Sequence, residues 1–155
     1  MNVLFRVAVL AALTALPPSD PYAALNSEER AILKPQIERW IHDQTKHAWS
    51  DMWEIQDQTP ELKNELLLGR RDAPDMDRAQ YVQAMRETIG IGYPEITAFT
   101  LREVSKEKDS YSVEGCAAQR RESWKQTSMV QVDVKIVEGK VKFGLFSSTP
   151  NLCKL

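Results

Sequence analysis

The sequence has few of the residues that bind metals or form catalytic sites. Its 155 residues include only two cysteines and two histidines, which fall short of the ligands of a structural zinc site. His42 and His47 are five residues apart, so they would lie about 140° apart around a helix rather than on one face. The sequence contains no glycine-rich phosphate loop and no serine nucleophile elbow. We therefore expect no metal and no cofactor.

The sequence also has no excess of charge of either sign. It contains 20 Lys and Arg against 22 Asp and Glu, for a formal net charge of −2, and bases and acids are interspersed. The densest basic pairs, Arg70-Arg71 and Arg120-Arg121, each have an acid beside them. Nucleic-acid binding needs a concentrated positive field, so nucleic acid is not expected as a partner.

No apolar run is long enough to cross a membrane. A spanning helix needs about 20 apolar residues, whereas the run from Val7 ends at Leu16, before Pro17. Because Arg6 precedes this run and small residues follow it, the pattern is typical of a signal peptide. We predict a leader over residues 1–24, with the exact cleavage site left open. The mature protein would then be secreted or periplasmic, with no membrane anchor.

Residues 25–155 are enough for one domain with its own core and too few for two domains of ordinary size. In an oxidising compartment, an even pair of cysteines is a candidate disulfide, so export and a Cys116–Cys153 bond support each other. Two free thiols are the alternative. A disulfide there would stabilise the fold by roughly 3 to 4 kcal/mol on the chain-entropy model.

The first half of this domain shows helical periodicity. Asn26 and the acids after it form a helix cap, and the apolar stripe that follows at helical spacing is Leu33, Ile37, Trp40 and Ile41. This predicts a helix over residues 27–44, either kinked at Pro35 or interrupted before it. Three further helices are predicted, over residues 49–53, 59–69 and 77–89.

From Glu95 onward the apolar pattern alternates, which predicts four half-buried strands with a tight turn at Glu138-Gly139. The inward-facing residues of the last three strands include no acid and no histidine: Tyr111, Val113, Ala117, Val130, Val132, Val134, Ile136, Val141, Phe143 and Leu145. In the first strand, residues 95–104, the apolar side chains change parity. This indicates a bulge that turns Arg102 or Glu103 inward. The fold class is therefore α+β, with N-terminal helices packed on an antiparallel sheet.

The order and aromatic placement of these elements resemble the nuclear transport factor 2-like superfamily. The resemblance covers residues 27–146 and depends on Trp40 in the first helix, the aromatic short helix over Trp49–Trp53, and a later helix ending in glycines before the meander. It implies a cone, in which a strongly curved sheet wraps the first helix and an apolar pocket opens at one end. The superfamily includes isomerase-like, dehydratase-like and cyclase-like enzymes as well as non-catalytic binding domains, so the fold alone does not choose a function.

Because the inward-facing residues include no acid and no histidine for proton transfer, we expect a non-catalytic domain that binds a small apolar ligand or a protein partner in this pocket. The candidate ligand-binding residues are Trp40, Trp49, Trp53, Tyr81 and Arg102. For the aromatic residues, packing in the core is the alternative role.

Two other functions remain open. One is a cofactor-independent isomerase, dehydratase or cyclase that uses Arg102, Glu103, Asp51 or Tyr81 in acid–base chemistry. The other is an assembly domain that forms a homodimer through the outer face of the sheet, where Gln131, Asp133, Lys135 and Lys142 give a polar surface.

Overall fold

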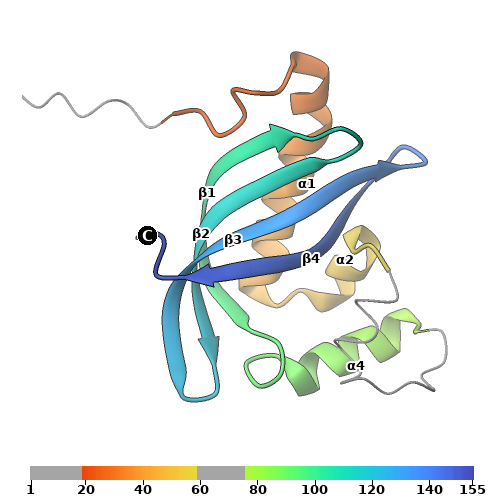
Figure 1. Cartoon of the computed structure of the whole chain (residues 1–155). Coiled ribbons are helices and arrows are strands. Elements are labelled where there is room, and N and C mark those ends of the chain that lie inside the picture. Colours follow the sequence, from red (N-terminus) through yellow and green to blue (C-terminus); the bar gives the residue numbers. More distant parts are fainter. Residues whose placement is uncertain (1–18, 59–75) are drawn as a thin grey trace, which may run out of the picture.

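The protein folds as helices packed on a single four-stranded antiparallel sheet, which confirms the predicted α+β class. A computed structural model describes residues 19–58 and 76–155. Its helices are α1 (Ser27–Lys46), α2 (Trp49–Ile55) and α4 (Arg78–Thr88). Its strands are β1 (Glu95–Lys106), β2 (Tyr111–Arg121), β3 (Trp124–Val137) and β4 (Lys140–Pro150), in the order β1-β2-β3-β4. Figure 1 shows α1 crossing one face of the bent sheet, with α2 and α4 beyond one end of α1. The helix predicted over residues 59–69 lies outside the described residues.

The long helix α1 begins at a capping box and continues through a proline. The Asn26 side chain accepts from the Glu29 amide at 2.9 Å, and the Glu29 carboxylate accepts from the Asn26 amide at 3.1 Å. Pro35 lies inside the helix, so the alternative of an interruption before it is wrong. Pro35 and Ala31 are both exposed, so water can reach the Ala31 carbonyl that has lost its helical donor.

The core lies between α1 and the inner face of the sheet. Leu33, Ile37 and Trp40 of α1 are at most 1% exposed. The Trp40 ring stacks on Phe143 at 5.7 Å and meets the edge of Phe99 at 5.6 Å. Most of the residues predicted to face inward are buried here: Val113, Ala117, Val130, Val132, Val134, Val141 and Phe143. The helix therefore covers the apolar face of the sheet.

Three residues predicted to face inward are less buried than the rest. Tyr111 and Leu145 are half-buried, and Ile136, near the tip of the β3–β4 hairpin, is 41% exposed. In β4 a register shift breaks the alternation, because Val132 pairs with Phe146. Phe146 thus takes the position opposite Val132 that strict alternation would give to Leu145.

Strand β1 contains the predicted irregularity, but with a different consequence. Its register against β2 shifts twice, between Ile96 and Ala98 and between Leu101 and Glu103. Each shift inserts one extra residue into β1. The first shift reverses which alternate residues face inward, and the second shift reverses it back. Arg102 and Glu103 are therefore exposed, and the prediction that one of them turns inward is wrong.

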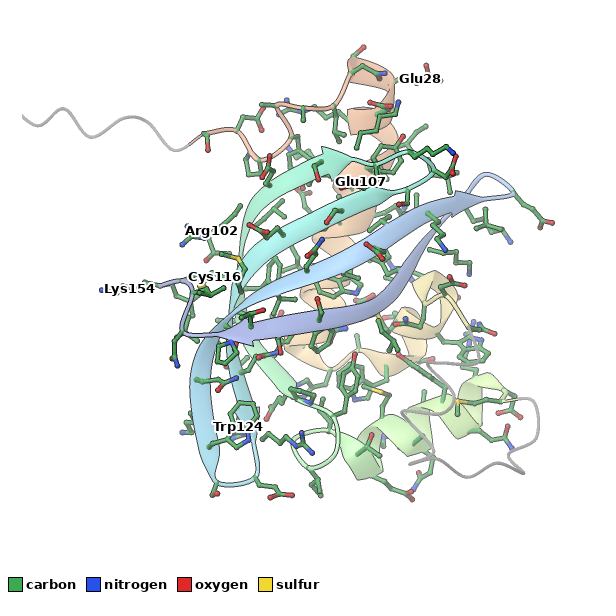
Figure 2. All side chains as sticks on the ribbon, in the orientation of Figure 1. Glu28, Arg102, Glu107, Cys116, Trp124 and Lys154 are labelled. Atoms are coloured by element: carbon green, nitrogen blue, oxygen red, sulfur yellow. A yellow bond between two sulfur atoms is a disulfide. The ribbon has the colours of Figure 1, made fainter. Side chains whose placement is uncertain are left out.

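The predicted disulfide between Cys116 and Cys153 is confirmed. Beyond β4 the chain turns back, with the Asn151 amide donating to the Thr127 carbonyl at 2.9 Å. The tail then crosses the outer face of the sheet to Cys116 on β2 and to Arg102 on β1, which donates to the Lys154 carbonyl at 2.9 Å (Figure 2). Such a bond fits an oxidising compartment. Within the described ranges, no helix combines the length and hydropathy that a bilayer crossing requires.

The residues just before α1 pack against the domain. Tyr22 is 5% exposed and belongs to the core cluster. The Pro21 carbonyl accepts from the Val104 amide at 2.8 Å. Asp20 accepts from the Tyr22 amide at 3.1 Å and pairs with Arg30 at 2.5 Å. Residues 1–18 of the predicted leader lie outside the described residues, so its removal stays a prediction; the contacts of Tyr22 favour a cut before Asp20 over one at residue 24.

A chain that begins at Leu25 should therefore be less stable than one that begins at Ser19. Full burial of a large side chain contributes about 1.5–3 kcal/mol, and the shorter chain also loses the hydrogen bond to Val104. We expect its free energy of unfolding to be lower by about 2–3 kcal/mol. Urea titration of the two purified chains measures this difference. Equal midpoints would show that the segment is dispensable and would allow cleavage at residue 24.

Candidate binding groove

An open groove of about 590 Å³ runs between α1, α2, the start of α4 and the β3–β4 hairpin. Among the residues that the structure describes, its charged lining consists of four cations and one acid: Arg39, Arg78, Lys140, Lys142 and Glu54. Apolar surface also lines it, from Ile32, Trp53, Ile55 and Val141. The described part of its lining is thus basic, on a protein whose formal net charge is −2.

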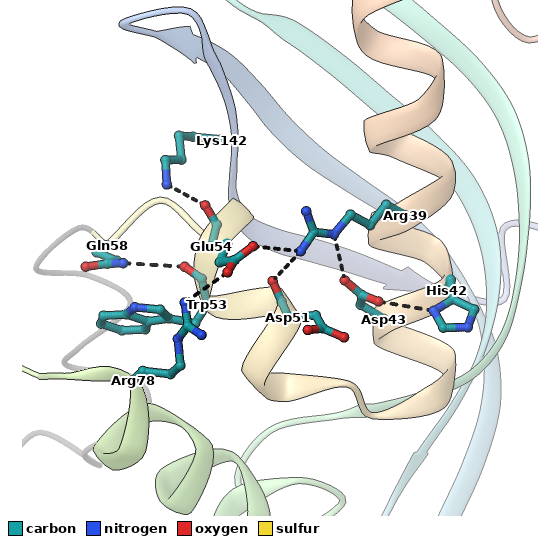
Figure 3. A network of polar contacts seen from close by, with 9 residues as sticks. All are labelled: Arg39, His42, Asp43, Asp51, Trp53, Glu54, Gln58, Arg78 and Lys142. Carbon is teal, nitrogen blue, oxygen red and sulfur yellow. Dashed lines mark hydrogen bonds and ion pairs between the residues drawn. The ribbon is translucent and has the colours of Figure 1, made fainter.

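Glu54 lies at the centre of the polar network of the groove (Figure 3). Its Oε2 accepts from Arg39 Nη2 at 3.1 Å and its Oε1 from Arg78 Nη2 at 3.0 Å. One carboxylate therefore bridges arginines that belong to α1 and α4. The Arg39 guanidinium, together with that of Arg78, holds the pKa of the Glu54 carboxyl below its usual value.

Arg39 is held in place from both sides. Its Nε lies 3.5 Å from Oδ2 of Asp43, one helical turn further along α1, and its Nη2 also donates to the Asp51 carbonyl at 3.1 Å. Asp43 is buried, and its other oxygen contacts His42 Nδ1 at 3.1 Å (Figure 3). These contacts direct the Arg39 guanidinium toward α2.

The hairpin contributes two lysines to the opposite wall. Its turn, Glu138-Gly139, has positive φ at both residues, 52° and 75°, as the predicted tight turn requires. Lys142 Nζ donates to the Glu54 carbonyl at 2.6 Å. Lys140 is exposed and forms no ion pair with any residue that the structure describes. Lys140 is therefore a cation of the groove that no described acid neutralises.

Of the residues predicted to bind a ligand, only Trp53 lines this groove. Trp53 is half-buried, with its ring 5.4 Å from that of Tyr81, which is 1% exposed. Trp40 is a core residue, as the alternative role anticipated. Trp49 is 5% exposed, stacks on His47 at 5.3 Å and lines a separate hollow of about 180 Å³. Arg102 lies far along the sheet, beside the C-terminal tail.

The residues considered for acid–base catalysis lie apart from one another. Asp51 is exposed on α2 beside the smaller hollow, and Glu103 is exposed on β1. Tyr81 is buried under Trp53, and burial raises the pKa of its phenol well above the usual value. The structure therefore does not bring these groups into one pocket. Over residues 19–58 and 76–155 there is also no group of His, Cys, Asp and Glu that could hold a metal.

The sequence did not point to Arg39, Arg78 or Lys140, and it placed Lys142 on the outer face of the sheet rather than in the groove. Arg39 and Asp43 have the spacing of a helical ion pair, which was the one local signal available. Glu54 and Arg78 are 24 residues apart, and Lys142 lies 88 residues beyond Glu54. Only the folded chain brings these charges together.

No family model, curated protein or solved structure matches the chain. The resemblance to the nuclear transport factor 2-like superfamily therefore stays a prediction from the order of elements. No residue role can be transferred from a relative.

Acid should destabilise the protein, because several carboxyl groups have lowered pKa values. The Tyr22 amide and then Arg30 lower the pKa of Asp20, and Lys106 and then the Asn26 amide lower that of Glu29. A carboxyl group whose pKa is lower in the folded than in the unfolded chain stabilises the fold above the unfolded value, about 4. That stability is lost as the pH falls through the folded pKa.

We therefore expect the urea midpoint to fall between about pH 6 and about pH 3. The Glu29→Gln variant, which removes one of these groups, should show a smaller fall. Midpoints that do not change with pH would contradict the ion pairs of Asp20, Glu29 and Glu54.

Proposed function

We propose that the protein is an exported, non-catalytic domain that binds a protein partner along the groove between α1, α2 and the β3–β4 hairpin. The observation that carries this proposal is the open groove itself, with Trp53 and two arginines in its lining. Tryptophan and arginine are enriched among the residues that dominate protein interfaces. A small-molecule site would instead enclose most of its ligand.

An exposed apolar side chain of the groove supports a macromolecular partner. Ile32 lines the groove and is 42% exposed. A partner that covers the groove would bury Ile32 together with Trp53. The disulfide supports the extracytoplasmic location.

Other observations make the remaining alternatives less favourable. A small apolar ligand would need space on the inner face of the sheet, where Leu33, Ile37 and Trp40 of α1 already pack. An acid–base enzyme would need its titratable groups in one pocket, whereas Asp51 lines the smaller hollow and Glu103 is exposed on β1.

Photo-cross-linking in the exporting cell tests the proposed partner site. A photoreactive side chain at Gln36 or Lys140, in the groove, should yield one discrete adduct. The same side chain at Ser147, exposed on β4, is the control and should yield none. Trp53→Ala should reduce the adduct by about tenfold, because interface tryptophans carry a large share of binding energy, and circular dichroism checks that the variant folds. Equal labelling at Ser147 and Gln36 would contradict the groove as the interface, and an adduct of twice the monomer mass at Ser147 alone would favour the homodimer.

A further inference from the structure

We propose that Arg39 and Arg78 form a carboxylate-binding site, which Glu54 occupies in the free protein and from which an acidic side chain of the bound partner displaces it. This inference rests on the proposed function and deepens it, because it names the partner as a protein segment that carries Asp or Glu. It also assigns Glu54 the role of an internal competitor.

The geometry of Glu54 matches that of a ligand carboxylate. Its two oxygens are divided between two guanidinium groups, at 3.1 Å from Arg39 and 3.0 Å from Arg78. The arginines come from different helices, so their spacing is set by the packing of the domain. Because one carboxylate fits between them with one oxygen on each, the same position suits the side chain of an Asp or Glu from outside.

The charge of the groove favours a further anion. Among the described residues, four cations line it against one acid, Glu54, and Asp43 lies 3.5 Å from Arg39. Lys140 adds a charge with no acid on it among the described residues. An acidic segment could therefore place one carboxylate between the arginines and a second near Lys140. Complementary charge of this kind steers association and selects between partners.

The ion pairs of Glu54 are accessible enough to exchange. The side chains of Glu54 and Arg78 are 50% and 51% exposed, and that of Arg39 is 35% exposed. Exposed pairs contribute little to stability, so replacing an internal carboxylate by an external one has a small cost. Apolar surface from Ile32, Trp53 and Val141 lies alongside the charges. An acidic segment with interspersed apolar residues would use both kinds of surface, which free phosphate cannot do.

Calorimetric titration with a short peptide of alternating Asp and Leu tests this site, and the matching Asn and Leu peptide is the neutral control. Glu54→Gln removes the competitor and should tighten binding of the acidic peptide by about threefold to tenfold. The matched control is Glu38→Gln, an exposed acid of α1 paired with Lys34 at 3.8 Å, which makes the same change in net charge outside the groove. Its effect should stay below about twofold. Arg78→Gln should weaken binding by about threefold or more.

Each outcome decides the proposal. Equal effects of Glu54→Gln and Glu38→Gln would overturn it, because net charge alone would then explain the gain. Tighter binding of a phosphoserine peptide than of the acidic one would assign the arginines to phosphate instead. If Glu54→Gln does not fold, Arg78→Gln still tests the site. If the unaltered protein does not bind the acidic peptide but still cross-links a partner from the groove, the carboxylate site is overturned and the proposed function stands. If it neither binds the peptide nor cross-links a partner, both proposals are overturned.

Discussion

Replacing Trp40 with alanine is expected to lower the free energy of unfolding by about 3–5 kcal/mol. The Trp40 ring is 1% exposed and lies against Phe143 and Phe99, so its removal leaves a cavity between α1 and the sheet. A loss of this size is a large part of the stability of an ordinary domain. Urea titration followed by circular dichroism measures it, and Trp40→Phe, which keeps an aromatic ring, gives a second value if the alanine variant does not fold.

Trp53→Ala is the matched control, because it removes the same side chain from a half-buried position. We expect its stability loss to be well below that of Trp40→Ala, since less of its surface is taken out of water. The yield of the cross-linked adduct should show the opposite order. Trp53→Ala should reduce the yield although the protein is folded, whereas Trp40→Ala should reduce it only to the extent that the protein unfolds. Similar stability losses for the two variants would contradict the different roles that the structure gives them.

The elements that the sequence predicts well are those specified by neighbouring residues. The cap at Asn26, the stripe from Leu33 to Trp40 and the hairpin at Glu138-Gly139 depend on spacings of a few residues, and all are observed. The inward rows of β2 and β3 also follow from alternation alone. Here local preference and tertiary packing point to the same structure.

Strand β1 shows where local pattern is insufficient. Its mixed parity indicates an irregularity, but whether there is one bulge or two depends on the register against β2. Gly115 on β2 is part of this register, because a Cβ there would lie 2.3 Å from Phe99 Cζ. Phe99 thus packs over a position without a side chain and stays inward between the two shifts. This fit between two strands cannot be deduced from either strand by itself.

The candidate site was predictable only through its aromatic residue. Trp53 attracts attention because it lies in a short aromatic helix, whereas Arg39, Glu54 and Arg78 each look like an ordinary solvated charge in their own helix. Their significance comes from one bridging carboxylate between separate helices. The same limit applies to the leader boundary, since the apolar run and small residues do not reveal that Tyr22 is a core residue.

Removing the disulfide is expected to lower the free energy of unfolding by about 4 kcal/mol, because the bond closes a loop over a separation of 37 residues. The double variant Cys116→Ala with Cys153→Ala is the suitable form, since Cys116 is fully buried and serine would leave a hydroxyl group without water. Urea titration of the variant and of the oxidised protein measures the difference, and reduction of the wild type provides an independent comparison.

The same double variant tests whether the disulfide affects binding in the groove as well as the stability of the fold. The disulfide ties the C-terminal tail to β2 beyond the end of β4, whereas the groove uses the first residues of β4 at the hairpin (Figures 1 and 2). We therefore expect the folded double variant to bind the acidic peptide within about twofold of the wild type, since sites without shared contacts are nearly independent. Unchanged stability would contradict the contribution of the disulfide. A large loss of peptide binding in the folded variant would show that the tail and the groove are coupled.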